Sequence, residues 1–113
     1  YFVACLKAVT GNEEFGRMET LLGIGERIYN IERAFNVREG ITRKDDTLPQ
    51  KILDRPAFPP YHKLDPALFV KWIDRLYELK GWNREGIPTK GTLEELGLSY
   101  VGQELGRRGI LLD

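Results

Sequence analysis

The stretch METLLGIGERIYNIERAFNVR, residues 18–38, decides the fold because it carries the strongest helical periodicity in the chain. Its apolar side chains recur every three or four residues and so share one face of an α-helix: Leu21, Ile24, Ile28, Ile31 and Phe35. At 1.5 Å per residue this helix is roughly 30 Å long. We expect this apolar stripe, Ile28 and Phe35 included, to be buried in the core.

Two glycines, Gly23 and Gly25, lie in the first half of this helix. Each costs a helix about 1 kcal/mol relative to alanine. Their presence predicts that another backbone approaches the helix closely. Because the glycines follow no strand, they do not match a dinucleotide-binding loop.

Upstream, residues 1–11 have the pattern of the end of a first helix, which Gly11 terminates. Cys5 shares a face with Leu6 and Val9, so we expect this thiol in the core. The chain begins within a helix and without a methionine. We therefore interpret residues 1–113 as a single domain, the C-terminal piece of a longer protein.

Downstream, Asp65 and Pro66 are typical of a helix start and Gly81 of its end. The apolar face of this helix contains Phe69, Trp72, Ile73, Leu76 and Leu79. We expect Trp72 and Trp82 to anchor the core or a domain interface.

Two shorter helices follow at the end of the chain. Thr92 and Glu95 match a capping box for a short helix that Gly97 ends. Ser99 begins a last helix that ends at Gly109. No segment alternates in the manner of a strand. The sequence therefore predicts an all-α fold, an irregular bundle of four to five helices with one long loop.

The long loop, residues 41–64, contains prolines and apolar residues, so we expect it to be ordered and packed against the helices. Its charged start, NVREGITRKDDTLP at residues 36–49, allows two interpretations. In one, Asp45 and Asp46 anchor the loop by accepting backbone N–H groups or by pairing with Arg38 or Arg43. In the other, Arg43 or Lys44 contacts an anionic cofactor. The residues favour the anchor.

Composition excludes several function classes. Seventeen basic and seventeen acidic residues cancel, so no overall field attracts nucleic acid or anionic lipid. No apolar run reaches the ~20 residues that span a bilayer. The single Cys5 excludes an internal disulfide and a four-cysteine cluster, and the single His62 excludes a multi-histidine metal site. We expect His62 to be a solvated loop imidazole, and the sequence supplies neither catalytic nor metal-binding residues.

Three segments carry a family resemblance: IGERIYNIERAFNVREGITRKDDTLP, then YELKGWNREGIPTKGTLEELGL, then ELGRRGIL. Together they resemble the C-terminal region of the tungsten-containing aldehyde:ferredoxin oxidoreductase family, from about Ala8 to Leu111. The resemblance implies a cytoplasmic enzyme that oxidises aldehydes to carboxylic acids and passes electrons to ferredoxin. It implies a tungstopterin and a [4Fe–4S] cluster whose ligands lie upstream of this chain, so none is assigned to Cys5.

The same family includes a subunit of a benzoyl-CoA reductase, so the resemblance does not fix the substrate. Two hypotheses remain open. In the first, the chain is a helical domain that walls a cofactor and substrate cavity and is active only when joined to its N-terminal domains. In the second, it is a free-standing helical interaction or scaffold module without redox activity.

Overall fold

The computed structural model describes residues 1–54 and 63–110, and within them the fold is all-α as predicted. The elements are α1 (Phe2–Thr10), the 3₁₀ turn η1 (Glu13–Gly16), α2 (Met18–Arg38), the 3₁₀ turn η2 (Arg43–Asp45), α3 (Gln50–Asp54), α4 (Pro66–Lys80), α5 (Lys90–Glu95) and α6 (Ser99–Arg107). The six α-helices slightly exceed the expected four to five, because the long loop contains the short α3. None of these described helices is long and apolar enough to cross a membrane.

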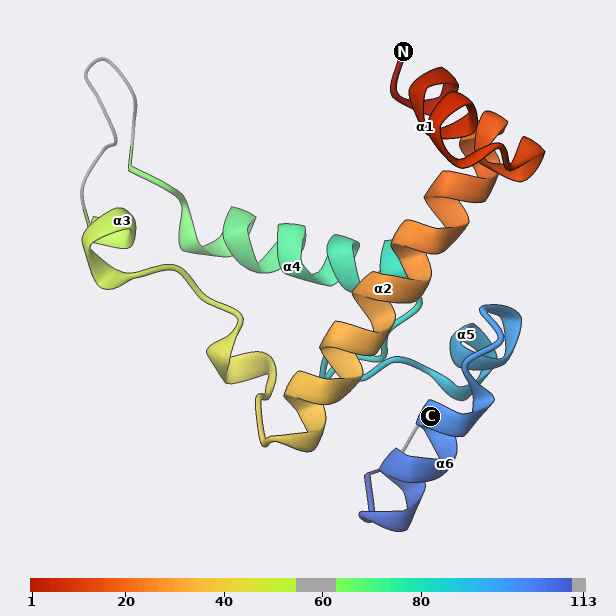
Figure 1. The fold of residues 1–113 in the computed structure, drawn as a ribbon. Helices are drawn as coiled ribbons and strands as arrows, with labels where there is room; N and C mark the ends of the chain where they lie inside the picture. The colour runs from red at the N-terminus through yellow and green to blue at the C-terminus, as the bar shows by residue number, and fades with distance from the viewer. Residues whose placement is uncertain (55–62, 111–113) are drawn as a thin grey trace.

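Helix α2 forms the axis of the molecule (Figure 1). Helix α1 and η1 lie at its N-terminal end, α4 meets its middle, and α5 and α6 lie beside its C-terminal half. The molecule measures 49 × 41 × 20 Å, and its radius of gyration is 17.8 Å. A compact domain of about 100 residues has a radius near ~13 Å. The chain is therefore open, with α1 and α3 far from the main core.

The core lies where α5 and α6 pack on the C-terminal half of α2. Leu93, Leu98 and Leu105 are almost completely buried there, together with Ala34 and Val37 of α2. A second cluster lies between α4 and α2 around Tyr77 and Trp82.

Several predicted helix ends are confirmed. The side chain of Asp65 accepts the N–H of Ala67 at 2.9 Å, and Pro66 follows at the first helical position. Gly11 and Gly81 end their helices in the left-handed conformation, both with φ of 67°.

The capping box predicted from Thr92 and Glu95 is wrong. Thr89 caps α5 by accepting the N–H of Thr92. The Thr92 hydroxyl instead donates to the carbonyl of Gly81 at 2.9 Å. This contact joins α5 to the end of α4, which local sequence could not reveal.

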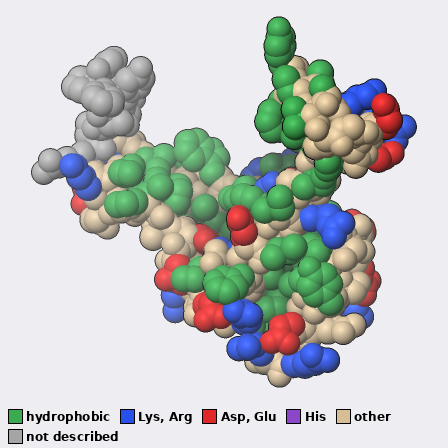
Figure 2. All heavy atoms as spheres, viewed as in Figure 1, with side chains coloured by type: hydrophobic (Ala, Val, Ile, Leu, Met, Phe, Trp, Pro, Cys, Tyr) green, Lys and Arg blue, Asp and Glu red, His purple; other side chains and the backbone are tan. Residues whose placement is uncertain are grey.

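The predicted burial of the α2 stripe is also wrong. Ile28 and Phe35 are 52% and 53% exposed, whereas the face of α2 that points inward carries Asn30, Arg33, Ala34 and Val37. Figure 2 shows hydrophobic side chains on the surface over α2 and over α4. Periodicity finds the apolar face of a helix, but it does not show whether a partner within this chain covers that face.

Two further expectations are not met within the described residues. A Cβ added to Gly23 or Gly25 would meet nothing within 4 Å, so no described backbone approaches them. Cys5 is exposed, and no residue of α1 is buried. Trp82 is buried as expected, whereas Trp72 is 55% exposed, so a place for Trp72 at a domain interface stays a prediction.

The long loop is only partly described. It contains η2 and α3, which the sequence did not predict, and Ile52 of α3 is half exposed instead of packed against the helices. The expectations for His62 and for the other residues of 55–62 lie outside the described residues.

Candidate functional site

The charged loop is closed by its own side chains. The carboxylate of Asp45 accepts the backbone N–H of Thr42 at 2.8 Å, and the Thr42 hydroxyl accepts the N–H of Lys44 at 3.3 Å. This reciprocal pair is a capping box, here on the 3₁₀ turn η2. The prediction that Asp45 accepts a backbone N–H is therefore confirmed.

Asp46 ties the loop to the body of the molecule through Arg33. The two guanidinium nitrogens of Arg33 donate to the two carboxylate oxygens of Asp46 at 2.7 and 2.6 Å. The Tyr77 hydroxyl donates to the same carboxylate. Such bidentate, charge-assisted bonds are among the strongest available to side chains. Asp46 is thus an anchor, as predicted.

The predicted partners of Asp46 are wrong. Arg38 instead pairs with the neighbouring Glu39 at 2.8 Å and lies over the Phe35 ring. Arg33 lies off the apolar stripe of α2, and that position is the only signal of its role in the sequence. Burial of its face of α2 makes Arg33 an internal cation that needs a carboxylate.

Arg33 also fixes the turn that follows α4. Its Nε donates to the carbonyl of Gly86 at 2.6 Å, and its guanidinium lies 4.9 Å from the Trp82 ring centroid. Gly86 has a φ of 76°, and a Cβ there would collide with Arg33 and Tyr77. Only glycine readily adopts this φ and also leaves room for the side chains of Arg33 and Tyr77. Arg33 thus connects α2, the charged loop, α4 and the turn at residues 82–88.

A second buried polar contact reinforces the same junction. The indole N–H of Trp82 donates to the side-chain oxygen of Asn30 at 2.9 Å, and the Asn30 amide donates to the carbonyl of Glu26 at 3.0 Å. The Tyr29 ring stacks on Trp82 with centroids 5.7 Å apart. Every buried polar side-chain atom of the described residues has a partner. The junction is therefore a satisfied, rigid network.

The network shifts two pKa values. Partial burial opposes ionisation of Asp46, but the hydrogen bonds from Arg33 and Tyr77 and the charges of Arg33 and Arg43 outweigh it and hold the Asp46 pKa below its usual 3.8. Burial, followed by the hydrogen bond to the Asp46 carboxylate and its negative charge, raises the Tyr77 pKa from 10.0 to about 12. Asp46 is therefore ionised and Tyr77 neutral across the physiological range.

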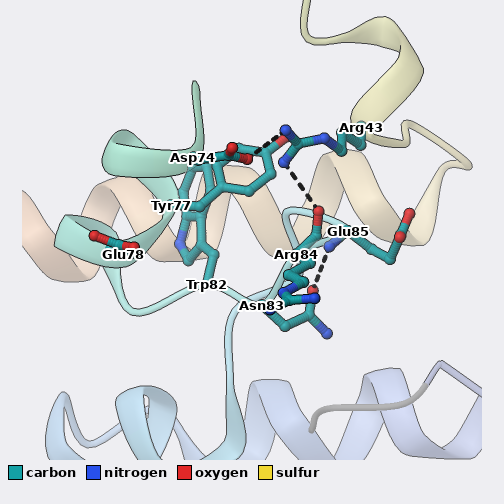
Figure 3. A pocket seen from close by; sticks show the side chains of 8 residues that line it. All are labelled: Arg43, Asp74, Tyr77, Glu78, Trp82, Asn83, Arg84 and Glu85. Atoms are coloured by element: carbon teal, nitrogen blue, oxygen red, sulfur yellow. Dashed lines mark hydrogen bonds and ion pairs between the residues drawn. The ribbon is translucent and has the colours of Figure 1, made fainter. Parts of the chain in front are cut away.

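Arg43 borders a pocket together with Tyr77 and Trp82 of this network (Figure 3). Its guanidinium donates to Asp74 at 2.5 Å and to the carbonyl of Arg84 at 3.1 Å, across this pocket of about 510 Å³. The pocket wall mixes both charges with two aromatic rings, and it is formed by Arg43, Asp74, Tyr77, Glu78, Trp82, Asn83, Arg84 and Glu85. Lys44, the next residue of η2, is exposed and is not part of this pocket wall. Cofactor contact by Arg43 or Lys44 stays a prediction.

The resemblance implies a tungsten cofactor and an iron–sulfur cluster, and the side chains that could bind metal are few in this chain. Within residues 1–54 and 63–110, no three His, Cys, Asp or Glu side chains lie close enough to hold a metal ion. A [4Fe–4S] cluster takes four cysteines, and the chain has one. The described residues therefore do not supply the ligand set of an iron–sulfur cluster.

This chain is similar to a protein family, to curated proteins and to a solved structure. The family model described as aldehyde ferredoxin oxidoreductase, domains 2 and 3, matches residues 1–98. The tungsten-containing aldehyde ferredoxin oxidoreductases of Pyrococcus furiosus and Thermococcus kodakarensis are 40% and 38% identical, each over 72% of this chain and 14% of the relative. The chain thus spans about a seventh of the length of these relatives.

A solved structure is also similar to this chain. It is the active-site complex BamBC of benzoyl coenzyme A reductase, in complex with 1,5-dienoyl-CoA. The match has a TM-score of 0.68 and 41% identity, and it covers 84% of this chain and 13% of that chain. Sequence and fold agree: this chain belongs to the aldehyde ferredoxin oxidoreductase family, in the region of its domains 2 and 3.

Proposed function

We propose that the chain is a helical domain of a larger oxidoreductase, that it walls part of the cofactor and substrate cavity, and that it is inactive alone. The observation that carries this proposal is the family match over residues 1–98. The chain spans only 14% of the length of the tungsten-containing relative from Pyrococcus furiosus. The open shape and exposed apolar faces also suit a part of a larger body.

For the parent enzyme, the tungsten-containing relatives favour oxidation of an aldehyde to a carboxylate with electrons passed to ferredoxin. Tungstopterin and a [4Fe–4S] cluster would be held by the N-terminal domains, and the compartment would be the cytoplasm. Within this chain, the Arg33–Asp46 pair holds the loop at residues 36–49 in one conformation. That rigidity suits a cavity wall, and Lys44 is the exposed cation on it.

A second candidate is a subunit of a reductase that acts on a coenzyme A thioester. The benzoyl coenzyme A reductase complex matches this chain at 41% identity over 84% of its length, slightly more than the 72% matched by the aldehyde oxidoreductases. Both candidates use this chain as the same helical domain.

Activity of the purified parent polypeptide tests the proposal. We expect tungsten, iron and aldehyde oxidation coupled to a viologen dye, and none of these in residues 1–113 alone. Reduction of an aromatic coenzyme A thioester without aldehyde oxidation would select the second candidate. A parent polypeptide without metal or either activity would leave the scaffold module as the function.

A Lys44→Ala variant of the parent tests the cavity wall. Lys44 is exposed, so its loss should leave stability within ~0.5 kcal/mol of the native value. Contact with an anionic cofactor or substrate predicts a fall in kcat/KM of about 10- to 100-fold, since a charge-assisted bond is worth about 1.5–3 kcal/mol. The control is Lys51→Ala, because Lys51 is also an exposed lysine but lies in α3. Equal activity of both variants would remove Lys44 from the cavity.

A further inference from the structure

The most apolar face of α2 lies on the surface. Ile24, Ile28, Ile31 and Phe35 are 37%, 52%, 38% and 53% exposed. With the half-buried Leu21 they follow one another at steps of three, four, three and four residues. That spacing is the seam of a helix that packs along a second helix. We call these five residues the α2 seam.

The surroundings of the α2 seam suit close packing. Gly25 lies beside it, and a Cβ there would meet nothing within 4 Å, so a neighbouring backbone has room to approach. At its C-terminal end, Ile31 and Phe35 border a groove of about 200 Å³ that Tyr100 and Val101 of α6 close on the other side. Small-molecule sites are usually ~300–1,000 Å³. The groove therefore suits a single protein side chain better than a cofactor.

We propose that the α2 seam is the docking site of one amphipathic α-helix, supplied by the part of the same polypeptide that lies outside residues 1–113. This inference rests on the proposed function, in which the chain is one domain of a larger enzyme. The docked helix would cross α2 at about +20° with apolar residues at spacings of three and four. One of its large side chains would enter the groove between α2 and α6.

Two observations favour this occupant over a second copy of the chain. The relatives are about seven times longer than the segment that matches, so most of the surface able to cover the seam belongs to the same polypeptide. A tethered helix also acts at an effective concentration in the millimolar range, which a separate molecule does not reach.

Cysteine labelling of the parent polypeptide tests whether the seam is covered. The Ile28→Cys variant replaces the centre of the seam, and Leu22→Cys is the control, since Leu22 is 62% exposed on the same helix but off the seam. Tryptic peptides 28–33 and 18–27 report the two positions separately by mass spectrometry. We expect a maleimide to label the Ile28→Cys variant at least about tenfold more slowly than the control. Equal rates would overturn the proposal.

Photocrosslinking identifies the occupant. A benzophenone amino acid is placed in turn at Ile24, Ile28 and Ile31 of the parent polypeptide. We expect all three to crosslink to one segment outside residues 1–113, at positions three or four residues apart. Crosslinks to a second copy, to scattered segments or to none would overturn the proposal.

The readout is separate from the test of the proposed function. A parent enzyme that oxidises aldehydes but gives no such crosslinks refutes the docked helix alone. A protein that gives the crosslinks but lacks metal and activity refutes the oxidoreductase assignment alone.

Discussion

Among single residues, Arg33 has the largest structural role. It pairs with Asp46 from the loop, donates to Gly86 from the turn and lies against Trp82 after α4. An arginine that is buried can be retained only if its donors are satisfied and its charge is paired. Arg33 meets both conditions, which explains why three segments distant in sequence converge on it.

Removing the charge of Asp46 should destabilise the chain. An Asp46→Asn substitution leaves the buried Arg33 without its bidentate partner, so we expect the free energy of unfolding to fall by about 1–3 kcal/mol. Urea unfolding measures it, with Glu32→Gln on the exposed side of α2 as control, expected within ~0.5 kcal/mol of the native value. An unchanged urea midpoint for Asp46→Asn would show that the pair does not anchor the loop.

Stability should also decline at both pH extremes. The Asp46 pKa is lowered from 3.8 on folding, so its stabilisation is full above that pH and is lost as the pH falls through the lower folded value. The Tyr77 pKa is raised from 10.0 to about 12, so its stabilisation is full below pH 10 and is lost by pH 12. Urea midpoints against pH measure both declines.

A Tyr77→Phe variant isolates the alkaline decline, because it cannot ionise at that position. The variant should lose less stability between pH 10 and 12 than the native chain does. An identical alkaline profile in the two proteins would contradict the role given to Tyr77.

Residue-level prediction from the sequence succeeded only where the contact is local. Asp45 binds Thr42, three residues away, and this was predictable from loop chemistry. Asp46 binds Arg33, thirteen residues away across a helix and a turn. That pairing depends on which face of α2 is buried, and the sequence pattern indicated the opposite face.

Among the helices, α2 shows the limits of the same reasoning. Its boundaries agree with those expected from periodicity and the following glycine, and the start and end of α4 were also predictable. The burial of α2 was not predictable, because the apolar stripe faces outward and a face with Asn30 and Arg33 faces inward. The stripe makes sense as a contact with structure outside this chain.

Truncating a core residue should lower the free energy of unfolding more than truncating a residue of the apolar stripe of α2. Leu98 is completely buried, so Leu98→Ala should lower the free energy of unfolding by about 2–5 kcal/mol. Phe35 is half exposed, so Phe35→Ala should cost about 1 kcal/mol. Urea unfolding of both variants measures the difference. A larger effect for Phe35→Ala than for Leu98→Ala would mean that the stripe belongs to the core of this chain.

Replacing Gly25, which lies beside the α2 seam, should change stability differently in residues 1–113 alone and in the parent enzyme. In residues 1–113 alone, Gly25→Ala should stabilise α2 by about 1 kcal/mol, since the added methyl group meets nothing. In the parent enzyme the same methyl group would stand against the docked helix, so the gain should vanish. Thermal unfolding of both proteins measures it, and an equal gain in both would contradict a close approach at Gly25.

Taken whole, the molecule has little core for its length. Its radius of gyration of 17.8 Å exceeds the ~13 Å of a compact domain, and its exposed apolar side chains extend along α1, α2 and α4. Isolated, such a surface should self-associate at high concentration, as severed interfaces do. The helix pattern predicted the all-α fold class, whereas the exposure of these apolar faces depends on contacts that periodicity does not report.

The central claim is that this chain is one helical domain of a larger metal-containing oxidoreductase. Native mass spectrometry of the polypeptide purified from the cells that make it tests this most directly, since one spectrum gives both chain mass and bound groups. The account predicts a chain several times longer than 113 residues, with the added mass of a tungsten cofactor and an iron–sulfur cluster. A stable 113-residue species without added mass would contradict it.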